Sequence, residues 1–108
     1  MDELCVVITA PDPEWLVEFS RQLVDERLAS AGHNYTPIRS VYRWRGKVHD
    51  KLEGRVSLHT RKGLVTEIVQ RANEQHPYEV PGVSTRPIED GNPEYLQCIL
   101  DETKEARV

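Results

Sequence analysis

Apolar and polar positions along the chain alternate between a strand-like and a helix-like period. The continuous apolar run at residues 4–8 (LCVVI) is typical of a central β-strand whose faces are covered. Residues 12–14 (DPE) then supply the capping side chain, proline and acid that begin a helix. Apolar residues recur on one face of this helix until about Ala31, and Gly32 is its expected stop.

The middle of the chain changes to a period of two, which predicts a long β-hairpin. Strand character begins at about Ile38 and continues to Trp44, so alternate side chains point to opposite faces. Residues 45–46 (RG) form the expected turn, because glycine adopts positive φ at little cost. The return strand is expected over residues 47–60, and its pattern is interrupted at residues 53–54 (EG), a candidate bulge.

The length of this hairpin suggests that it projects from the domain. A return strand of 14 residues spans roughly 46 Å, whereas a compact domain of this size is roughly 35 Å across. Tyr42, Trp44 and Val48 near the tip are costly to leave in water. We therefore expect an oligomer in which the hairpin of one subunit engages a neighbour. The alternative is a bulge at Gly54 that folds the hairpin back onto its own sheet.

The second half of the chain repeats the alternation of helix and strand. A helix capped by Thr60 is expected to run to about Gln75. Residues 76–81 (HPYEVP) follow, and their two prolines make a short, stiff corner. Residues 83–88 are expected to form a strand, which Pro87 restricts to the edge of a sheet.

A last helix is expected to begin at residues 92–94 (NPE), which repeat the start signal of the first helix. The order is strand, helix, strand, strand, helix, strand, helix. Right-handed crossovers then favour a single domain over residues 1–108 of the α+β class. We predict a ferredoxin-like split βαβ sandwich with an antiparallel sheet, an extra C-terminal helix and a long hairpin. Its first and third strands are expected to be central.

Composition narrows the function classes. The chain has 108 residues, of which 30% are charged and 38% hydrophobic, and its net charge is −4. An acidic domain is a poor partner for nucleic acid, and no apolar run approaches the ~20 residues that a membrane helix needs. Residues 1–3 (MDE) are acidic, whereas a signal peptide begins with basic residues. We therefore expect a cytoplasmic protein that binds neither nucleic acid nor membrane.

Catalytic motifs are absent from the sequence. It contains no GxSxG, Walker, HExxH or GxGxxG pattern. Small ferredoxin-like enzymes that hydrolyse acyl phosphates hold the anion in a glycine loop after the first strand. Residues 9–12 (TAPD) stand there instead and offer few N–H groups and a negative charge. We predict that the protein is not an enzyme.

Metal binding is the open question, because imidazole and thiolate are good ligands of copper and zinc. The candidate ligands are Cys5, His33, His49, His59, His76 and Cys98. They form no CxxC pair, and the neighbours His49 and Asp50 point to opposite faces of a strand. The corner that His76 begins is either a ligand site or a joint that aims the last strand, and we favour the joint.

Five blocks of sequence together resemble the CutA divalent-cation tolerance family. They are residues 9–12 (TAPD), 26–29 (ERLA), 38–46 (IRSVYRWRG), 76–81 (HPYEVP) and 90–96 (DGNPEYL). The blocks follow the family's order and spacing over nearly the whole chain. The resemblance implies a ferredoxin-like homotrimer assembled through the hairpin of residues 38–60. It also implies a role in tolerance of copper and other divalent cations without catalytic activity.

The resemblance also implies a metal site. Some members carry a cysteine just before TAPD and two histidines before PY as proposed copper ligands. Ile8, Gln75 and His76 occupy these positions, so only His76 matches. His76 is therefore the predicted metal ligand, and copper(II) is the predicted metal. The alternative function is that of a PII-like regulatory trimer, which binds a small effector in clefts between its subunits.

Overall fold

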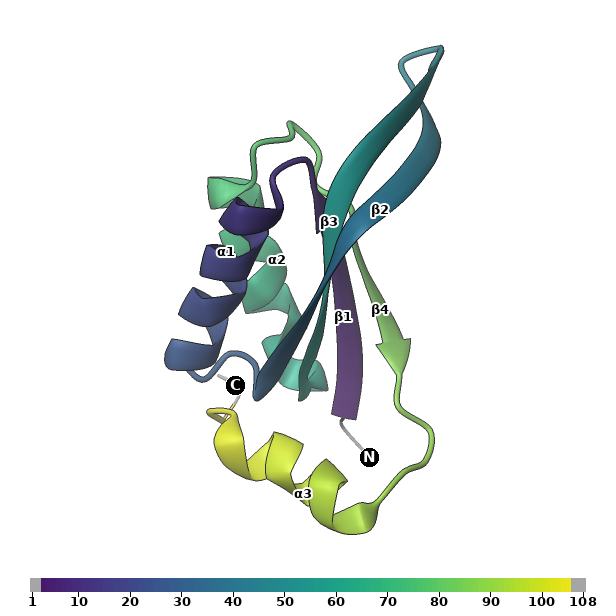
Figure 1. Cartoon of the computed structure of the whole chain (residues 1–108). Coiled ribbons are helices and arrows are strands. Elements are labelled where there is room, and N and C mark those ends of the chain that lie inside the picture. Colours follow the sequence, from purple (N-terminus) through teal and green to yellow (C-terminus); the bar gives the residue numbers. More distant parts are fainter. Residues whose placement is uncertain (1–2, 106–108) are drawn as a thin grey trace.

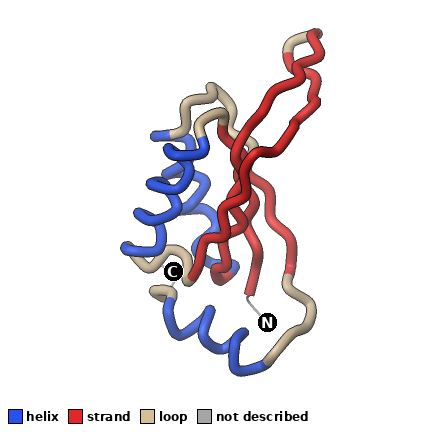
Figure 2. Tube along the Cα trace, viewed as in Figure 1, coloured by secondary structure: helices blue, strands red, loops and turns tan. Residues whose placement is uncertain are grey.

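The chain folds as one antiparallel sheet with two helices on one face and a third across its end. The computed structural model describes residues 3–105, with side chains from Val6 onward. Its elements are β1 (Glu3–Ala10), α1 (Pro13–Asp25), β2 (Ala31–Trp44), β3 (Lys47–Arg61), a 3₁₀ turn (Lys62–Leu64), α2 (Val65–Gln75), β4 (Val83–Pro87) and α3 (Pro93–Glu102). Figure 1 shows α1 and α2 side by side against the sheet, and Figure 2 shows the strands extending beyond them.

The sheet has the predicted topology. Its strand order is β2-β3-β1-β4, and β1 pairs antiparallel with both β3 and β4. The first and third strands are therefore central, and the expectation that Pro87 belongs to an edge strand is confirmed. The predicted ferredoxin-like α+β fold is thus confirmed, with α3 as the additional C-terminal helix.

The core lies between the sheet and the helices α1 and α2. Its apolar members are buried from solvent, and each valine, leucine, isoleucine or phenylalanine among them contributes roughly 1.5–3 kcal/mol. They are Val6, Ile8, Ala10, Leu16, Phe19, Leu23, Leu28, Ala29, Val56, Leu58, Leu64, Ile68 and Ala72. Inward side chains of β1 and β3 meet the apolar stripes of the two helices. The core therefore explains both the strand-like and the helix-like spacing of apolar residues in the sequence.

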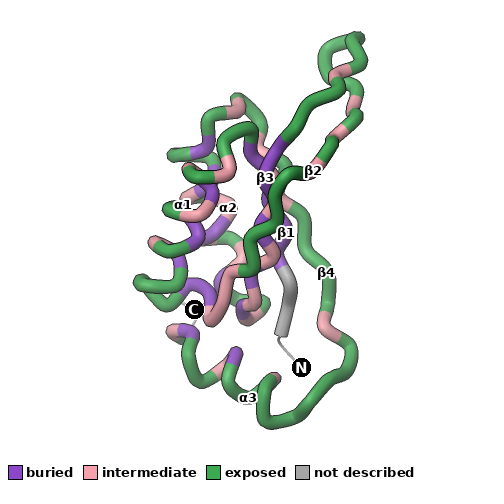
Figure 3. Tube along the Cα trace, viewed as in Figure 1, coloured by how far each residue is buried: buried purple, intermediate pink, exposed green. Residues whose placement is uncertain are grey.

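The hairpin is built as predicted at its tip. Arg45 and Gly46 both have positive φ, 49° and 78°, which is the backbone twist that closes a two-residue hairpin turn. Pairing between β1 and β3 ends at Gly54, so residues 38–53 project past β1 as a two-stranded arm. We call this segment the arm. Figure 3 shows it largely exposed, in contrast to the buried centre of the sheet.

The expected bulge lies in the other strand. The register between β2 and β3 shifts between Tyr35 and Ile38, so the extra residue belongs to β2 and not to residues 53–54 of β3. Pro37, within the shift, has no N–H to give to the ladder. Glycine is required at position 54 by close packing and not by a bulge. A Cβ added there would lie 3.0 Å from the Cα of Pro13 at the start of α1.

Three element boundaries differ from the prediction. Helix α1 ends at Asp25, not near Ala31, because Arg27 adopts φ 60° and turns the chain. Strand β2 begins at Ala31, not at about Ile38, because residues 31–35 already pair with β3. Thr60 does not cap α2. It continues the inward face of β3, and its hydroxyl donates to the Leu28 carbonyl at 2.6 Å. None of the helices in residues 3–105 is long and apolar enough to cross a bilayer.

Candidate functional site

The HPYEVP corner of residues 76–81 is fastened to the end of β1 through His76. The His76 side chain is 8% exposed, and its Nε2 lies 2.7 Å from the Thr9 carbonyl oxygen. The Tyr78 N–H donates to Nδ1 at 3.0 Å. Because Nδ1 accepts, Nε2 carries the proton and donates to Thr9. The His76 side chain therefore bonds to β1, while its backbone N–H donates to the Ala72 carbonyl of its own helix. These contacts give the corner the geometry of a joint between α2 and β1.

This geometry bears on the predicted metal ligand. Both ring nitrogens of His76 already have partners within the chain. Ile8 and Gln75 bring no thiolate or imidazole to the site. No three His, Cys, Asp or Glu side chains come together in a metal-binding group within the residues that the structure describes. A metal at His76 would have to displace the Tyr78 N–H, so the assignment of His76 stays a prediction.

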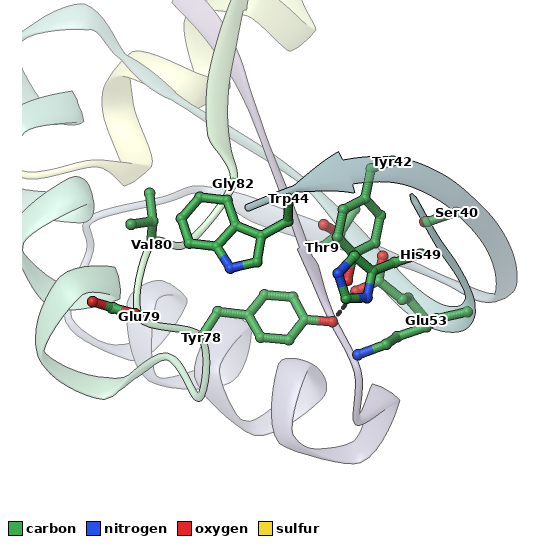
Figure 4. A pocket seen from close by; sticks show the side chains of 11 residues that line it. Thr9, Ser40, Tyr42, Trp44, His49, Glu53, Tyr78, Glu79, Val80 and Gly82 are labelled. Carbon is green, nitrogen blue, oxygen red and sulfur yellow. Dashed lines mark hydrogen bonds between the residues drawn. The ribbon is translucent and has the colours of Figure 1, made fainter. Parts of the chain in front are cut away.

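A cavity of about 520 Å³ lies between the arm and the corner (Figure 4). Aromatic side chains from both segments line it, and Tyr42, Trp44 and Tyr78 are the largest of them. The complete lining is Thr9, Ser40, Tyr42, Trp44, His49, Lys51, Glu53, Tyr78, Glu79, Val80 and Gly82. Apolar walls with a few polar groups are typical of sites for small organic ligands.

The cavity contains a buried carboxylate. Glu53 is 3% exposed, and the Tyr78 hydroxyl donates to its Oε2 at 2.6 Å. Burial, and after it the hydrogen bond to Glu53, raise the pKa of Tyr78 well above its usual value, so the phenol stays protonated as a donor. The Lys51 ammonium lies 6.0 Å from the centre of the Tyr78 ring. The wall thus offers one fixed anion and one cation beside aromatic faces.

A second contact joins the arm to the corner. At the tip, the Arg45 guanidinium is 2.6 Å from the Glu79 carboxylate. Both side chains are largely exposed, so the pair adds little to stability. On the cavity wall, the rings of Tyr42 and His49 stack with centroids 5.1 Å apart. His49 therefore belongs to the cavity and is separated from the other histidines by its place on the arm.

The remaining metal candidates lie elsewhere. The rings of His33 and His59 have centroids 5.1 Å apart, and His59 Nδ1 is 2.7 Å from the Tyr95 hydroxyl of α3. Burial, and after it the proximity of His33, lower the pKa of His59. Cys98 is exposed on α3, and the side chain of Cys5 is outside the described part of the chain.

Sequence reasoning missed two features of this arrangement. Alternation correctly placed Ser40, Tyr42 and Trp44 on one face of β2. It carried no signal that Glu53 would be buried against Tyr78, 25 positions away in the sequence. The pairing of His33 with His59 also depends on strand register, which the sequence does not reveal.

The fold and site define a ferredoxin-like α+β protein with a projecting hairpin and an aromatic cavity between the hairpin and the HPYEVP corner. The family described as CutA1 divalent ion tolerance protein matches residues 4–102. The chain therefore belongs to this family of divalent-cation tolerance proteins, as its sequence blocks predicted.

Individual relatives agree with this assignment. The divalent-cation tolerance protein CutA of Pyrococcus horikoshii is 35% identical over 101 residues, which are 94% of this chain and 98% of that protein. Protein CutA of Mus musculus is 33% identical over 97 residues, which are 90% of this chain. The chain spans little more than half of several such relatives, 55% of the mouse protein and 54% of the human one.

Solved structures of the family superimpose closely. CutA1 from Oryza sativa matches with a TM-score of 0.93 at 30% identity, covering 98% of this chain and 97% of that one. The divalent cation tolerance protein Cut A1 from Thermus thermophilus matches with a TM-score of 0.90 at 33% identity, covering 94% and 99%.

Proposed function

We propose that this chain acts as a non-enzymatic, trimeric protein of divalent-cation tolerance in the cytoplasm, and that it binds copper(II) through His76. The observation that carries the proposal is the position of His76. It is the one member of the family's histidine pair present here, and it sits where the corner, β1 and the cavity meet. A metal bound to His76 would therefore contact or displace groups of the corner, of β1 and of the cavity wall.

The tautomer of His76 decides which nitrogen would bind the metal. Nε2 carries a proton directed at the Thr9 carbonyl, so the lone pair is on Nδ1. Copper(II) at Nδ1 would replace the Tyr78 N–H. His76 supplies one imidazole, and the other donors would be water or groups of a neighbouring subunit. Because Tyr78 lines the cavity, metal binding would alter the cavity wall.

The arm supports the proposed trimer. Val41, Val48 and Leu52 are 65%, 62% and 67% exposed in the single chain. The register places all of them on the face of the arm opposite the cavity. An exposed apolar face on a projecting hairpin is stabilised when another chain covers it.

The loop between β1 and α1 supports a non-enzymatic role. The Asp12 carboxylate caps the N-terminus of α1, and its Oδ1 accepts a hydrogen bond from the Glu14 N–H at 3.0 Å. At least one N–H group of this helix start is thus already bonded to a carboxylate, whose negative charge disfavours an acyl phosphate in the same place.

Calorimetric titration of the metal-free full chain with copper(II) tests the metal part of the proposal. We compare the wild type with His76→Ala and with His76→Gln, whose amide keeps a donor for Thr9. Stoichiometric binding that both variants lose supports His76 as a ligand. Light scattering on the same samples should give three times the chain mass of 12.4 kDa. Undiminished binding by both variants would contradict the assignment.

A second function is favoured by the cavity itself. Its volume of about 520 Å³ and its aromatic walls suit a small effector, as in PII-like regulatory trimers. Thermal unfolding with ATP, ADP or copper(II) separates the two functions. A rise in the unfolding temperature with a nucleotide supports the regulatory function, whereas a response to copper alone supports the metal function.

A further inference from the structure

The cavity between the arm and the corner contains a negative charge that the chain itself leaves unpaired. Among residues 6–105, Glu53 is the only buried aspartate or glutamate, with 3% of its surface exposed. Its Oε2 accepts a hydrogen bond from the Tyr78 hydroxyl at 2.6 Å, and no salt bridge within these residues includes it. A buried carboxylate without a cation is destabilising, and such a cost is typical of a binding site.

The positive side chains nearest to Glu53 along β3 do not neutralise it. Lys51 is on the same face of the strand and also lines the cavity, but its side chain is exposed and its Nζ lies 6.0 Å from the centre of the Tyr78 ring. Arg55 does not line the cavity, and its Nε has no hydrogen-bond partner within residues 6–105. The place beside Glu53 is therefore open to a cation that a ligand supplies.

The aromatic walls of the cavity attract cations and apolar groups. Figure 4 shows the side chains of Tyr42, Trp44 and Tyr78 directed toward one space, from β2 and from the corner. The faces of such rings carry a negative potential that binds ammonium and guanidinium groups. The Arg45 guanidinium already uses this attraction, 5.2 Å from the centre of the Trp44 ring. Trp44 and Val80 are 41% and 61% exposed, so the apolar body of a ligand would gain by covering them.

The charges of the lining favour a cationic ligand over an anionic one. Glu53 and Glu79 both belong to the lining, and Lys51 is the only lysine or arginine in it. An anionic ligand would add a like charge near the buried carboxylate, whereas a cationic ligand would supply the missing opposite charge. The volume of about 520 Å³ accommodates an ammonium group together with an aromatic body.

We propose that the cavity binds an organic ammonium ion carried on an aromatic or other apolar body, with Glu53 as its counter-ion and Trp44 and Tyr78 as its walls. The ammonium N–H groups donate to the Glu53 carboxylate, and the apolar body lies against the two rings. The inference rests on the second function proposed above, a regulatory protein that binds a small effector, and it names the chemical class of that effector.

Calorimetric titration of the full chain with phenethylammonium tests the inference. Two comparison ligands keep the aromatic body and change the charge, since hydrocinnamate is anionic and phenethyl alcohol is neutral. The protein should bind the ammonium ion at least about tenfold more tightly than either comparison ligand, because only the cation pairs with Glu53. Nuclear magnetic resonance should show shifts of the Trp44 indole N–H and of the Tyr78 backbone N–H during the titration. Equal affinities for the three ligands would overturn the inference.

Two variants should change the affinity for phenethylammonium in opposite directions. Glu53→Gln keeps an acceptor for the Tyr78 hydroxyl but removes the charge, so it should weaken binding by at least about tenfold. Lys51→Met removes the competing cation beside the Tyr78 ring and should strengthen binding by roughly threefold. Glu74→Gln, at an exposed position of α2, is the matched control and should leave the affinity unchanged.

Circular dichroism establishes that each variant is folded. If Glu53→Gln does not fold, Lys51→Met decides the matter, and binding no tighter than that of the wild type would refute the role of the cavity charges. If Glu53→Gln folds and binds phenethylammonium as the wild type does, Glu53 is not the counter-ion and the inference fails.

Titration with ATP and ADP separates the inference from the function on which it rests. If a nucleotide binds and phenethylammonium does not, the inference is overturned while the regulatory function stands. If phenethylammonium binds with the expected dependence on Glu53 and neither nucleotide binds, the inference stands and the nucleotide part of that function fails. A chain that binds none of these ligands refutes both.

Discussion

The hydroxyl of Thr60 illustrates how a residue type in the sequence can point to the wrong structural role. A threonine before a helical pattern is a typical capping residue. Here the side chain is fully buried at the end of β3 and donates to the Leu28 carbonyl of the loop that follows α1. The bond satisfies a buried acceptor and ties two segments 32 positions apart.

Replacing Thr60 with valine should therefore destabilise the protein. The substitution keeps the shape but leaves the Leu28 carbonyl without this donor, at a cost of about 1–3 kcal/mol. Urea denaturation measures the difference. Thr66→Val, an exposed position in α2, is the matched control and should change stability by less than about 0.5 kcal/mol. Equal effects at the two positions would contradict a structural role for the buried hydroxyl.

At the scale of elements, Arg27 connects the end of α1 to the end of α3. Arg27 lies just past the helix with φ 60°, and the Leu28 N–H returns to the Leu23 carbonyl at 2.8 Å. This is the Schellman arrangement, in which glycine usually occupies the left-handed position. The Arg27 guanidinium compensates by donating to the Asp101 and Glu102 carbonyls at the end of α3.

Two substitutions separate the backbone strain from the side-chain bonds. Arg27→Ala loses the guanidinium bonds and keeps the strained φ, whereas Arg27→Gly loses the bonds but relieves the strain. The glycine variant should therefore be more stable than the alanine variant by about 1 kcal/mol in denaturant unfolding.

Arg21, on the exposed side of the same helix, provides the control. Glycine should there be less stable than alanine by about 1 kcal/mol, because the position is inside the helix. An alanine variant at Arg27 that equals or exceeds the glycine variant would refute the strain argument.

At the scale of the whole molecule, the arm gives the domain its elongated shape. The chain measures 43 × 27 × 24 Å. The long dimension is close to the span expected for the return strand alone, as the length argument from the sequence anticipated. Within residues 3–105, no third strand lies beside residues 38–53 of the arm, so the stability of the arm depends on what covers it.

Val41→Asp should release monomers if the arm joins the subunits. A carboxylate at position 41 would stand directly opposite Asp50 in the ladder and would place a charge beside the apolar Val48 and Leu52 that the assembly is expected to cover. Sedimentation equilibrium should then show a shift from three chain masses toward one. Val24→Asp is the matched control, since it makes the same change on α1, away from the arm. A mass unchanged by Val41→Asp would refute the assembly through the arm.

The sequence by itself determined the order of the elements, the hairpin turn, the central and edge strands and the family. These features follow from local information: hydrophobic period, prolines and glycines at element ends, and runs of characteristic residues. It also placed Tyr42 and Trp44 on a common face, because alternation in a strand is strict.

Only the tertiary structure decided which distant side chains meet. Arg27 at the end of α1 meets α3, and Tyr78 of the corner meets the buried Glu53 of the arm. The closeness of His33 and His59 depends on the register of β2 against β3, including the extra residue near Pro37. Strand register and packing between segments are properties of the folded chain, so no local pattern carries them.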